Sequence, residues 1–171
     1  DAQGYLWLAT QNGVARFDGV RFEVYSLEDH PGLRTSIIER VHVDARQRIW
    51  VGGARGLSQI DGSEVRAYNS GELGEITVHA LLDDVNGELL VGTALGLFAI
   101  RQDTATRIEA IGSPARALLH HDDAVLVGGI GGAWWWDRHQ ARWLALPEEH
   151  ANTQINSLVD SPDGPIAASS K

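Results

Sequence analysis

The sequence contains neither cysteine nor methionine, and Lys171 is its only lysine. Without cysteine, the chain can form no disulfide framework, thiolate metal site or thiol nucleophile. No segment approaches the run of about 18 apolar residues that spans a membrane as a helix. Because translation begins with methionine, we expect a chain that starts at Asp1 to be a processed product or a piece of a longer protein.

Positive charge is also scarce. The 171 residues hold 14 Lys and Arg against 23 Asp and Glu, which gives a formal net charge of −9. Surfaces that bind nucleic acid need clustered positive charge against the phosphates, and this sequence has no basic run. We therefore predict no nucleic-acid partner and no direct binding of this chain to an anionic membrane.

Glycine, by contrast, is abundant, with 19 residues, and much of it recurs in register. Comparing the chain with itself shows one pattern in residues 1–18, 44–61, 84–101 and 122–137, with a shorter copy in 161–170. The glycines that mark the same turn are 43, 40 and 36 residues apart: Gly13, Gly56, Gly96 and Gly132. Several aligned features that recur together predict a repeat protein.

Each repeat is predicted to form four short strands. In the second copy these are an apolar run at 37–43, then 49–51, 57–60 and a more polar strand at 64–68. A turn of the Asp-x-x-Gly type separates the first two, because Asp bonds its own backbone and Gly accepts positive φ. No segment shows sustained 3.6-residue apolar periodicity, so we expect almost no helix.

Units of about 40 residues with four strands are typical of β-propeller blades. A β-sandwich would not repeat at this spacing with matched glycines. WD-type repeats are disfavoured because the single Trp-Asp pair, Trp136-Asp137, lies on the wrong strand. We predict an all-β fold, a partial β-propeller over residues 1–171 with about four blades of four antiparallel strands. The expected repeat units are 1–43, 44–83, 84–120 and 121–160, with the start of a fifth at 161–171.

The repeat resembles a known family. Its pattern is Asp-x-x-Gly-x-Leu-Trp-hydrophobic-Gly/Ala-Thr-x-x-Gly-hydrophobic-x-x-Phe-Asp, and residues 1–18 match it best. This is similar to the two-component-regulator propeller repeat. The later copies depart from it, with Gln47 in place of Gly, Gly53 in place of Thr and Leu90 in place of Trp. The fourth copy keeps the glycines and loses the opening turn.

The resemblance implies a larger, seven-bladed propeller in the parent protein. The chain would then begin at the second strand of one blade and end within another. An open stack exposes two apolar blade faces, which predicts association with the rest of the parent propeller or with a second copy. In this family, such propellers form the extracytoplasmic, periplasmic sensor part of inner-membrane receptors. Those receptors often carry a histidine kinase or diguanylate cyclase in the cytoplasm.

One polar position stands out in the predicted innermost strands. Aligning these strands places four different polar residues at one level: Glu39, His79, Arg116 and Asn156. On a propeller, this level converges near the mouth of the central channel. An acid, an imidazole, a guanidinium and an amide could bind a small polar ligand there, with carbohydrate one candidate class. The alternative is a set of polar residues that only face water in the channel.

A run of three tryptophans is the second anomaly. Trp136 aligns with Phe17, Ile60 and Ile100, which is a blade-core position. Trp134 and Trp135 align with variable positions, and the repeat does not explain them. Exposed aromatic side chains anchor interfaces and stack on sugars, so both residues are candidates for an interaction surface. Packing against an adjoining blade is the favoured alternative.

No metal or cofactor site is predicted. His120, His121, Asp122 and Asp123 resemble a metal cluster, but they occupy the slot of the opening turn. Adjacent strand residues point to opposite faces, so the two histidines are not expected to share an ion. No phosphate-loop, dinucleotide or Gly-x-Ser-x-Gly pattern occurs.

Three functional hypotheses follow. The first is a sensory, ligand-binding propeller domain that relays an extracytoplasmic signal to a kinase or cyclase, without being an enzyme itself. The second is a lyase-like propeller enzyme, which would need a base such as Glu39 or His79 grouped with Arg116 or a metal. The third is a purely structural interaction module.

Overall fold

The computed structural model describes residues 1–70 and 72–170. The first blade contains β1 (Leu6–Thr10), β2 (Gly13–Phe17) and β3 (Phe22–Tyr25). The second contains β4 (Ile38–Val43), β5 (Ile49–Gly53), β6 (Gly56–Asp61) and β7 (Glu64–Ala67). The third contains β8 (Val78–Asp83), β9 (Leu89–Thr93), β10 (Gly96–Arg101) and β11 (Thr104–Arg107). The fourth contains β12 (Ala117–His121), β13 (Ala124–Gly128), β14 (Gly132–Trp136) and β15 (Ala141–Ala145). A fifth sheet pairs β16 (Gln154–Val159) with β17 (Ile166–Ser170).

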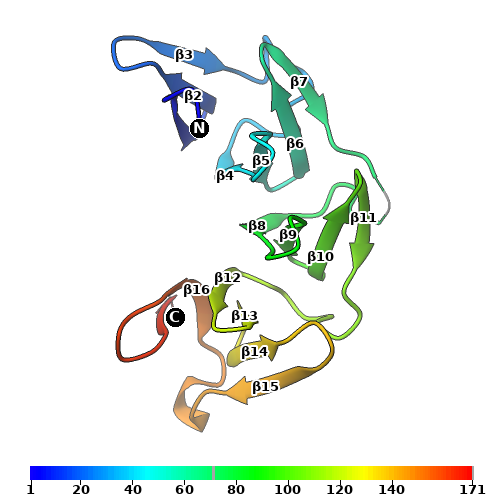
Figure 1. The fold of residues 1–171 in the computed structure, drawn as a ribbon, viewed down its shortest axis with the longest axis vertical. Coiled ribbons are helices and arrows are strands. Elements are labelled where there is room, and N and C mark those ends of the chain that lie inside the picture. The colour runs from blue at the N-terminus through cyan, green and yellow to red at the C-terminus, as the bar shows by residue number, and fades with distance from the viewer. Residues whose placement is uncertain (71, 171) are drawn as a thin grey trace.

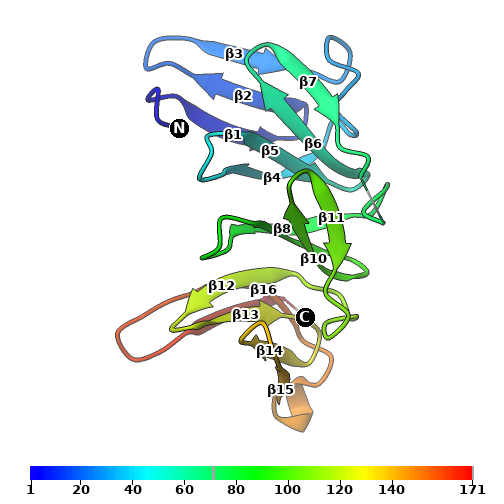
Figure 2. The same cartoon turned by 45° about the vertical axis from the view of Figure 1, so that its right-hand side comes forward.

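Every sheet is an antiparallel meander of consecutive strands. The sheets stand side by side along an arc, with β4, β8, β12 and β16 on the concave side and β7, β11 and β15 outside (Figure 1). Figure 2 shows the same succession of sheets from a second direction. The predicted all-β architecture with antiparallel four-stranded blades is confirmed. The seven-bladed parent stays a prediction.

Helix is nearly absent, as the sequence predicts. In the part of the chain that the structure describes, the only helical segment is the 3-10 turn η1 (Glu148–His150), between β15 and β16. Among these residues there is no helix with the length and apolarity needed to cross a bilayer.

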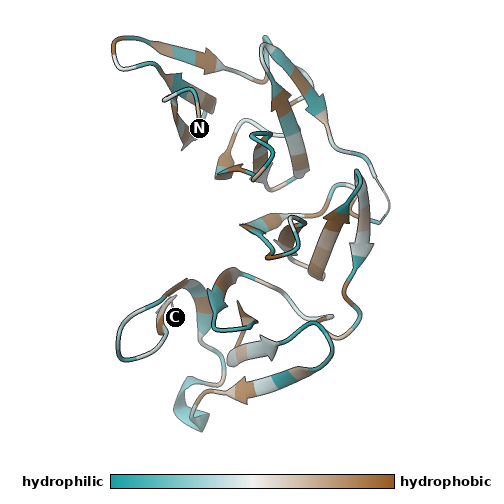
Figure 3. Cartoon of the chain, viewed as in Figure 1, coloured by the Kyte–Doolittle hydropathy of each residue, from teal (hydrophilic) through white to brown (hydrophobic). Residues whose placement is uncertain are grey.

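Three apolar clusters fill the junctions between blades, because a sheet with a neighbour on each side packs against both. Hydrophobic residues recur along the strands of the blades (Figure 3). The first to second junction holds Val14, Tyr25, Leu33, Ile38 and Val51. The second to third holds Trp50, Leu57, Val78, Val91 and Phe98. The third to fourth holds Leu90, Leu97, Val125, Val127 and Trp136. Exposed apolar side chains occur on the first blade and the fifth sheet, and also on the blades between them: Leu6, Phe22, Val24, Val85, Leu95, Leu144, Val159 and Ile166.

A recurring glycine lets neighbouring blades approach closely. It lies in the second strand of three successive blades: Gly52, Gly92 and Gly128. A Cβ at the first of these would lie 2.5 Å from Val78 Cγ1, and at the second 2.6 Å from the Ala115 carbonyl oxygen. At the third it would lie 2.7 Å from Ile155 Cγ2. The innermost strand of the next blade therefore packs directly on this glycine.

Candidate functional site

In the second repeat, the opening aspartate fixes the turn between the two innermost strands. Asp44 Oδ1 accepts hydrogen bonds from the backbone N–H groups of Arg46 and Arg48, both at 2.9 Å. Asp44 Oδ2 accepts from Trp50 Nε1 at 2.9 Å and from Arg48 Nε at 2.6 Å. The motif Asp and Trp are therefore structural, and they hold one end of the inner strand in place.

In the third copy, a different side chain donates hydrogen bonds to the opening aspartate. Leu90 replaces the tryptophan, and the guanidinium of Arg138 reaches Asp84 from the fourth blade, with Nε 3.1 Å from Oδ2 and Nη2 bonded to Oδ1. Burial raises the pKa of the Asp84 carboxyl, but the hydrogen bond and charge of Arg138 outweigh it, so the net pKa lies below the ordinary value. Sequence reasoning missed Arg138, because nothing in its local pattern marks it as a partner of Asp84.

The opposite end of the inner strands carries the predicted polar level. Glu39, His79 and Asn156 each lie at a β-bulge, where the strand carries one extra residue relative to its partner. Arg116 is equivalent, since it precedes the Ala117 and Gly128 pair and donates its backbone N–H to the Gly128 carbonyl at 2.8 Å. A bulge re-aims the side chain of its extra residue. The sequence alignment thus placed the four residues at one structural position.

Three of these four residues interact electrostatically. His79 is half-buried, and burial lowers its pKa below the ordinary value. The positive charge of Arg116 lowers it further, Glu39 opposes this, and Arg40 adds to the lowering. Because β8 contacts both β4 and β12, His79 lies between Glu39 of β4 and Arg116, which immediately precedes β12. Asn156 occupies the same bulge on β16, the strand next to β12.

The two candidate tryptophans are half-buried and make contacts within the chain. The Trp134 indole N–H donates to Ser113 Oγ at 3.1 Å, and its ring centroid lies 5.0 Å from that of Trp143. Trp135 meets the His121 ring edge-on at 5.8 Å. Trp136 is 6% exposed, which confirms its predicted blade-core position. The interaction surface at Trp134 and Trp135 stays a prediction.

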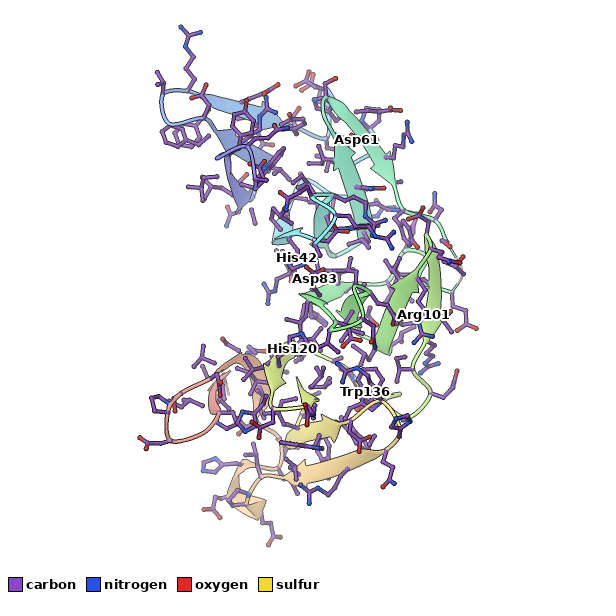
Figure 4. The ribbon with its side chains drawn as sticks, viewed as in Figure 1. His42, Asp61, Asp83, Arg101, His120 and Trp136 are labelled. Carbon is purple, nitrogen blue, oxygen red and sulfur yellow. The ribbon has the colours of Figure 1, made fainter. Side chains whose placement is uncertain are left out.

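Histidines also lie at the other end of the inner strands, where Figure 4 labels His42, Asp83 and His120. His42 Nε2 is 3.1 Å from Asp83 Oδ1 on the next blade, and His120 Nε2 contacts the Asp83 carbonyl oxygen. His121 points instead to Asp160 Oδ1, at 3.1 Å. Consecutive histidines thus contact opposite neighbours. In residues 1–70 and 72–170, no three His, Asp or Glu side chains are grouped to hold a metal ion.

A cleft of about 360 Å³ lies between the first and second blades and was not predicted. Trp7, Arg16, Arg48 and Asp61 are among the residues that line it. Two of its arginines are already engaged, since Arg16 pairs with Glu23, and Arg48 with Asp44 and Asp103. Sequence reasoning missed the cleft because it forms only where two separate repeats meet.

No family model matches the chain, and no curated protein matches it by sequence. Solved structures do. The extracellular domain of a hybrid two-component system from B. thetaiotaomicron, BT3049, superimposes with a TM-score of 0.79 at 17% identity. A second such domain from that organism, BT4673, superimposes with a TM-score of 0.81 at 16% identity. The match covers 96% of this chain in both cases, but only 24% and 25% of those chains.

Enzymes share the fold as well. Virginiamycin B lyase from Staphylococcus aureus superimposes with a TM-score of 0.73 at 11% identity, over 96% of this chain and 59% of the lyase. At these identities the likeness establishes the fold alone. The chain folds as a set of successive β-propeller blades, and it spans about a quarter of the receptor domains that it resembles.

Proposed function

We propose that this chain is part of the sensory, ligand-binding propeller of a bacterial signal-transduction receptor. Its place is outside the cytoplasm, and the parent is anchored in the inner membrane and carries a kinase or diguanylate cyclase. A small polar ligand, with carbohydrates as one candidate class, binds at the inner-strand cluster, which we define as Glu39, His79, Arg116 and Asn156. The likeness to extracellular domains of two-component systems supports this proposal.

The main support for this proposal is that the residues of the inner-strand cluster occupy equivalent positions in successive sheets. Four chemically different polar residues stand at equivalent positions of four successive sheets: Glu39, His79 and Asn156 at a bulge of the inner strand, and Arg116 immediately before β12. His79 is half-buried, and both Glu39 and Arg116 act on it electrostatically. Ligand binding there contacts several blades at once, so it can favour one relative arrangement of the blades over another.

The test is a thermal-shift and calorimetric screen of sugars, amino acids and organic acids against the chain and its H79A/R116A variant. We expect a ligand that stabilises the chain and loses its effect in the variant. The matched control is H139A/R142A, which removes one exposed histidine and one exposed arginine outside the cluster. Equal binding by both variants would contradict the site. In the receptor, H79A/R116A should abolish the ligand-dependent change in kinase or cyclase activity.

A lyase-like activity is the second candidate, and one observation favours it. Burial and the charge of Arg116 lower the pKa of His79, which favours the neutral ring that a general base requires. The enzyme proposal would replace the sensor proposal if the chain converts the ligand found in the screen to a product, and if H79A stops this conversion but still binds the ligand. If no ligand is found and the variants behave like wild type, a structural interaction module remains.

A further inference from the structure

Arg116 differs from the other buried arginines of the chain. Its Nε atom is buried and has no hydrogen-bond partner. Arg34 and Arg107 also bury an unpartnered Nε, but their terminal nitrogens are bonded, Arg34 to Glu75 and Arg107 to the Leu95 carbonyl. For Arg116, no ion pair or side-chain hydrogen bond occurs within residues 1–70 and 72–170.

A buried, unpartnered Nε–H group is costly. A buried donor without an acceptor loses its hydration and gains nothing in return. Other arginines that reach a neighbouring blade pair with carboxylates, as Arg138 does with Asp84 and Arg48 with Asp103. Arg116 therefore retains a place for an acceptor that residues 1–70 and 72–170 do not supply.

The charges around Arg116 favour an anion. Arg40 adds a second positive charge near His79, and its guanidinium donates to the Glu39 backbone carbonyl at 2.8 Å rather than to a carboxylate. With the His79 ring neutral, Arg40 and Arg116 against Glu39 leave one surplus positive charge. The neutral ring also supplies one N–H donor and one acceptor.

We propose that the inner-strand cluster binds a ligand carrying one carboxylate, held by the Arg116 guanidinium with the His79 ring as a second hydrogen-bonding group. A planar carboxylate matches the two parallel N–H groups of a guanidinium. Glu39 supplies the selectivity, because its negative charge repels a second acidic group on the same ligand. This inference rests on the proposed function and specifies the chemistry of its ligand.

The experiment uses matched probe pairs that differ in the acidic group: lactate with lactamide, glucuronate with glucose, and benzoate with benzamide. Binding is followed by NMR at the Arg116 Nε–H and His79 ring resonances, against chloride at equal ionic strength. We expect at least one carboxylate to shift both resonances and its neutral counterpart to bind at least about tenfold more weakly.

Two variants are expected to change carboxylate binding in opposite directions. R116Q should weaken carboxylate binding at least about tenfold, whereas E39Q should tighten it several-fold because a competing negative charge is removed. R21Q, at an exposed arginine on the first blade, should leave it unchanged. If R116Q does not fold, R116K, which keeps the charge and loses the paired N–H geometry, should give an intermediate loss.

Two results would overturn the inference. The first is that a neutral probe binds as tightly as its carboxylate partner and that E39Q has no effect. The cluster would then bind polar ligands without any preference for a carboxylate. If no carboxylate shifts either resonance more than chloride does, the anion is excluded. The proposed function then fails as well only if the wider screen finds no ligand that depends on His79 and Arg116.

Discussion

Arg138 of the fourth blade bonds to Asp84 of the third, at the site where the Trp50 indole bonds to Asp44 in the second. The Asp84 side chain is only 2% exposed, so its negative charge depends on this partner. The repeat keeps the buried aspartate but changes the donor from a residue of the same blade to one of the next. The substitution ties the third blade to the fourth.

Replacing Arg138 by Gln should destabilise the chain substantially. Removing one partner of a buried pair leaves an uncompensated charge, and the partial exposure of Arg138 reduces the cost to about 2–3 kcal/mol. Urea unfolding gives the value. The control is R101Q, because Arg101 is 65% exposed in its pair with Glu88 and should cost less than about 1 kcal/mol. Equal losses in the two variants would contradict the structural role of Arg138.

The buried aspartates should make the chain sensitive to acid. Burial acts to raise the pKa of Asp44, but hydrogen bonds from Trp50 and Arg48 outweigh it, and Asp84 is also held below its ordinary value of 3.8. A carboxyl with a lowered folded pKa contributes stability above its unfolded pKa and loses it as the pH falls through the folded value. We therefore expect the free energy of unfolding to drop below about pH 4, as measured by urea titrations at successive pH values.

In R138Q, this acid loss should begin at higher pH, because burial without the guanidinium raises the pKa of Asp84. An unchanged acid profile in R138Q would mean that Asp84 is solvated, against its observed burial.

His79 should contribute a separate loss of stability at mildly acidic pH. Its folded pKa is lowered by burial and then by Arg116, so the folded chain resists protonation that the unfolded chain accepts. Stability should therefore be complete above the unfolded value of about 6.5 and fall as the pH drops toward the folded value. Proton NMR of the His79 ring measures the pKa directly.

The R116Q variant tests the cause of that shift. Removing the guanidinium should raise the pKa of His79 toward its ordinary value, whereas E39Q should lower it further. Movement of the His79 pKa in the same direction in both variants would refute the arrangement of His79 between Glu39 and Arg116.

The close approach of blades at Gly52 predicts a steric conflict on substitution. G52A should cost about 1–3 kcal/mol, because the added methyl would overlap Val78 of the next blade. The loss should be partly recovered in G52A/V78A, so that the double variant is more stable than the sum of the two single losses predicts. G112A is the control, since Gly112 is exposed and its added Cβ meets only the flexible end of Arg107 at 3.3 Å. Strict additivity in the double variant would argue against direct contact.

Much of the fold follows from local sequence. The predicted strands 49–51 and 57–60 lie inside β5 and β6, and the predicted 64–68 differs from β7 by one residue. Such agreement is expected where short apolar runs, Asp-Gly turns and a repeat all favour the same structure. The level of the inner-strand cluster was also predictable, because a repeat places equivalent residues at equivalent positions.

Contacts between blades were not predictable in the same way. Nothing near Arg138 in the sequence indicates Asp84, and nothing in the first or second repeat alone indicates the cleft between them. The opposite directions of His120 and His121 were predictable from strand alternation, but their partners Asp83 and Asp160 were not. These contacts join residues 37 to 54 positions apart in the sequence.

The sequence by itself determined the blade, since strand, turn and glycine positions are set by backbone sterics and by alternation within one repeat. The tertiary structure alone decided which charges are satisfied. Arg138 finds a carboxylate across a blade junction. That pairing arises from how neighbouring blades pack, because burial removes water and leaves each charge dependent on whichever group the next blade presents.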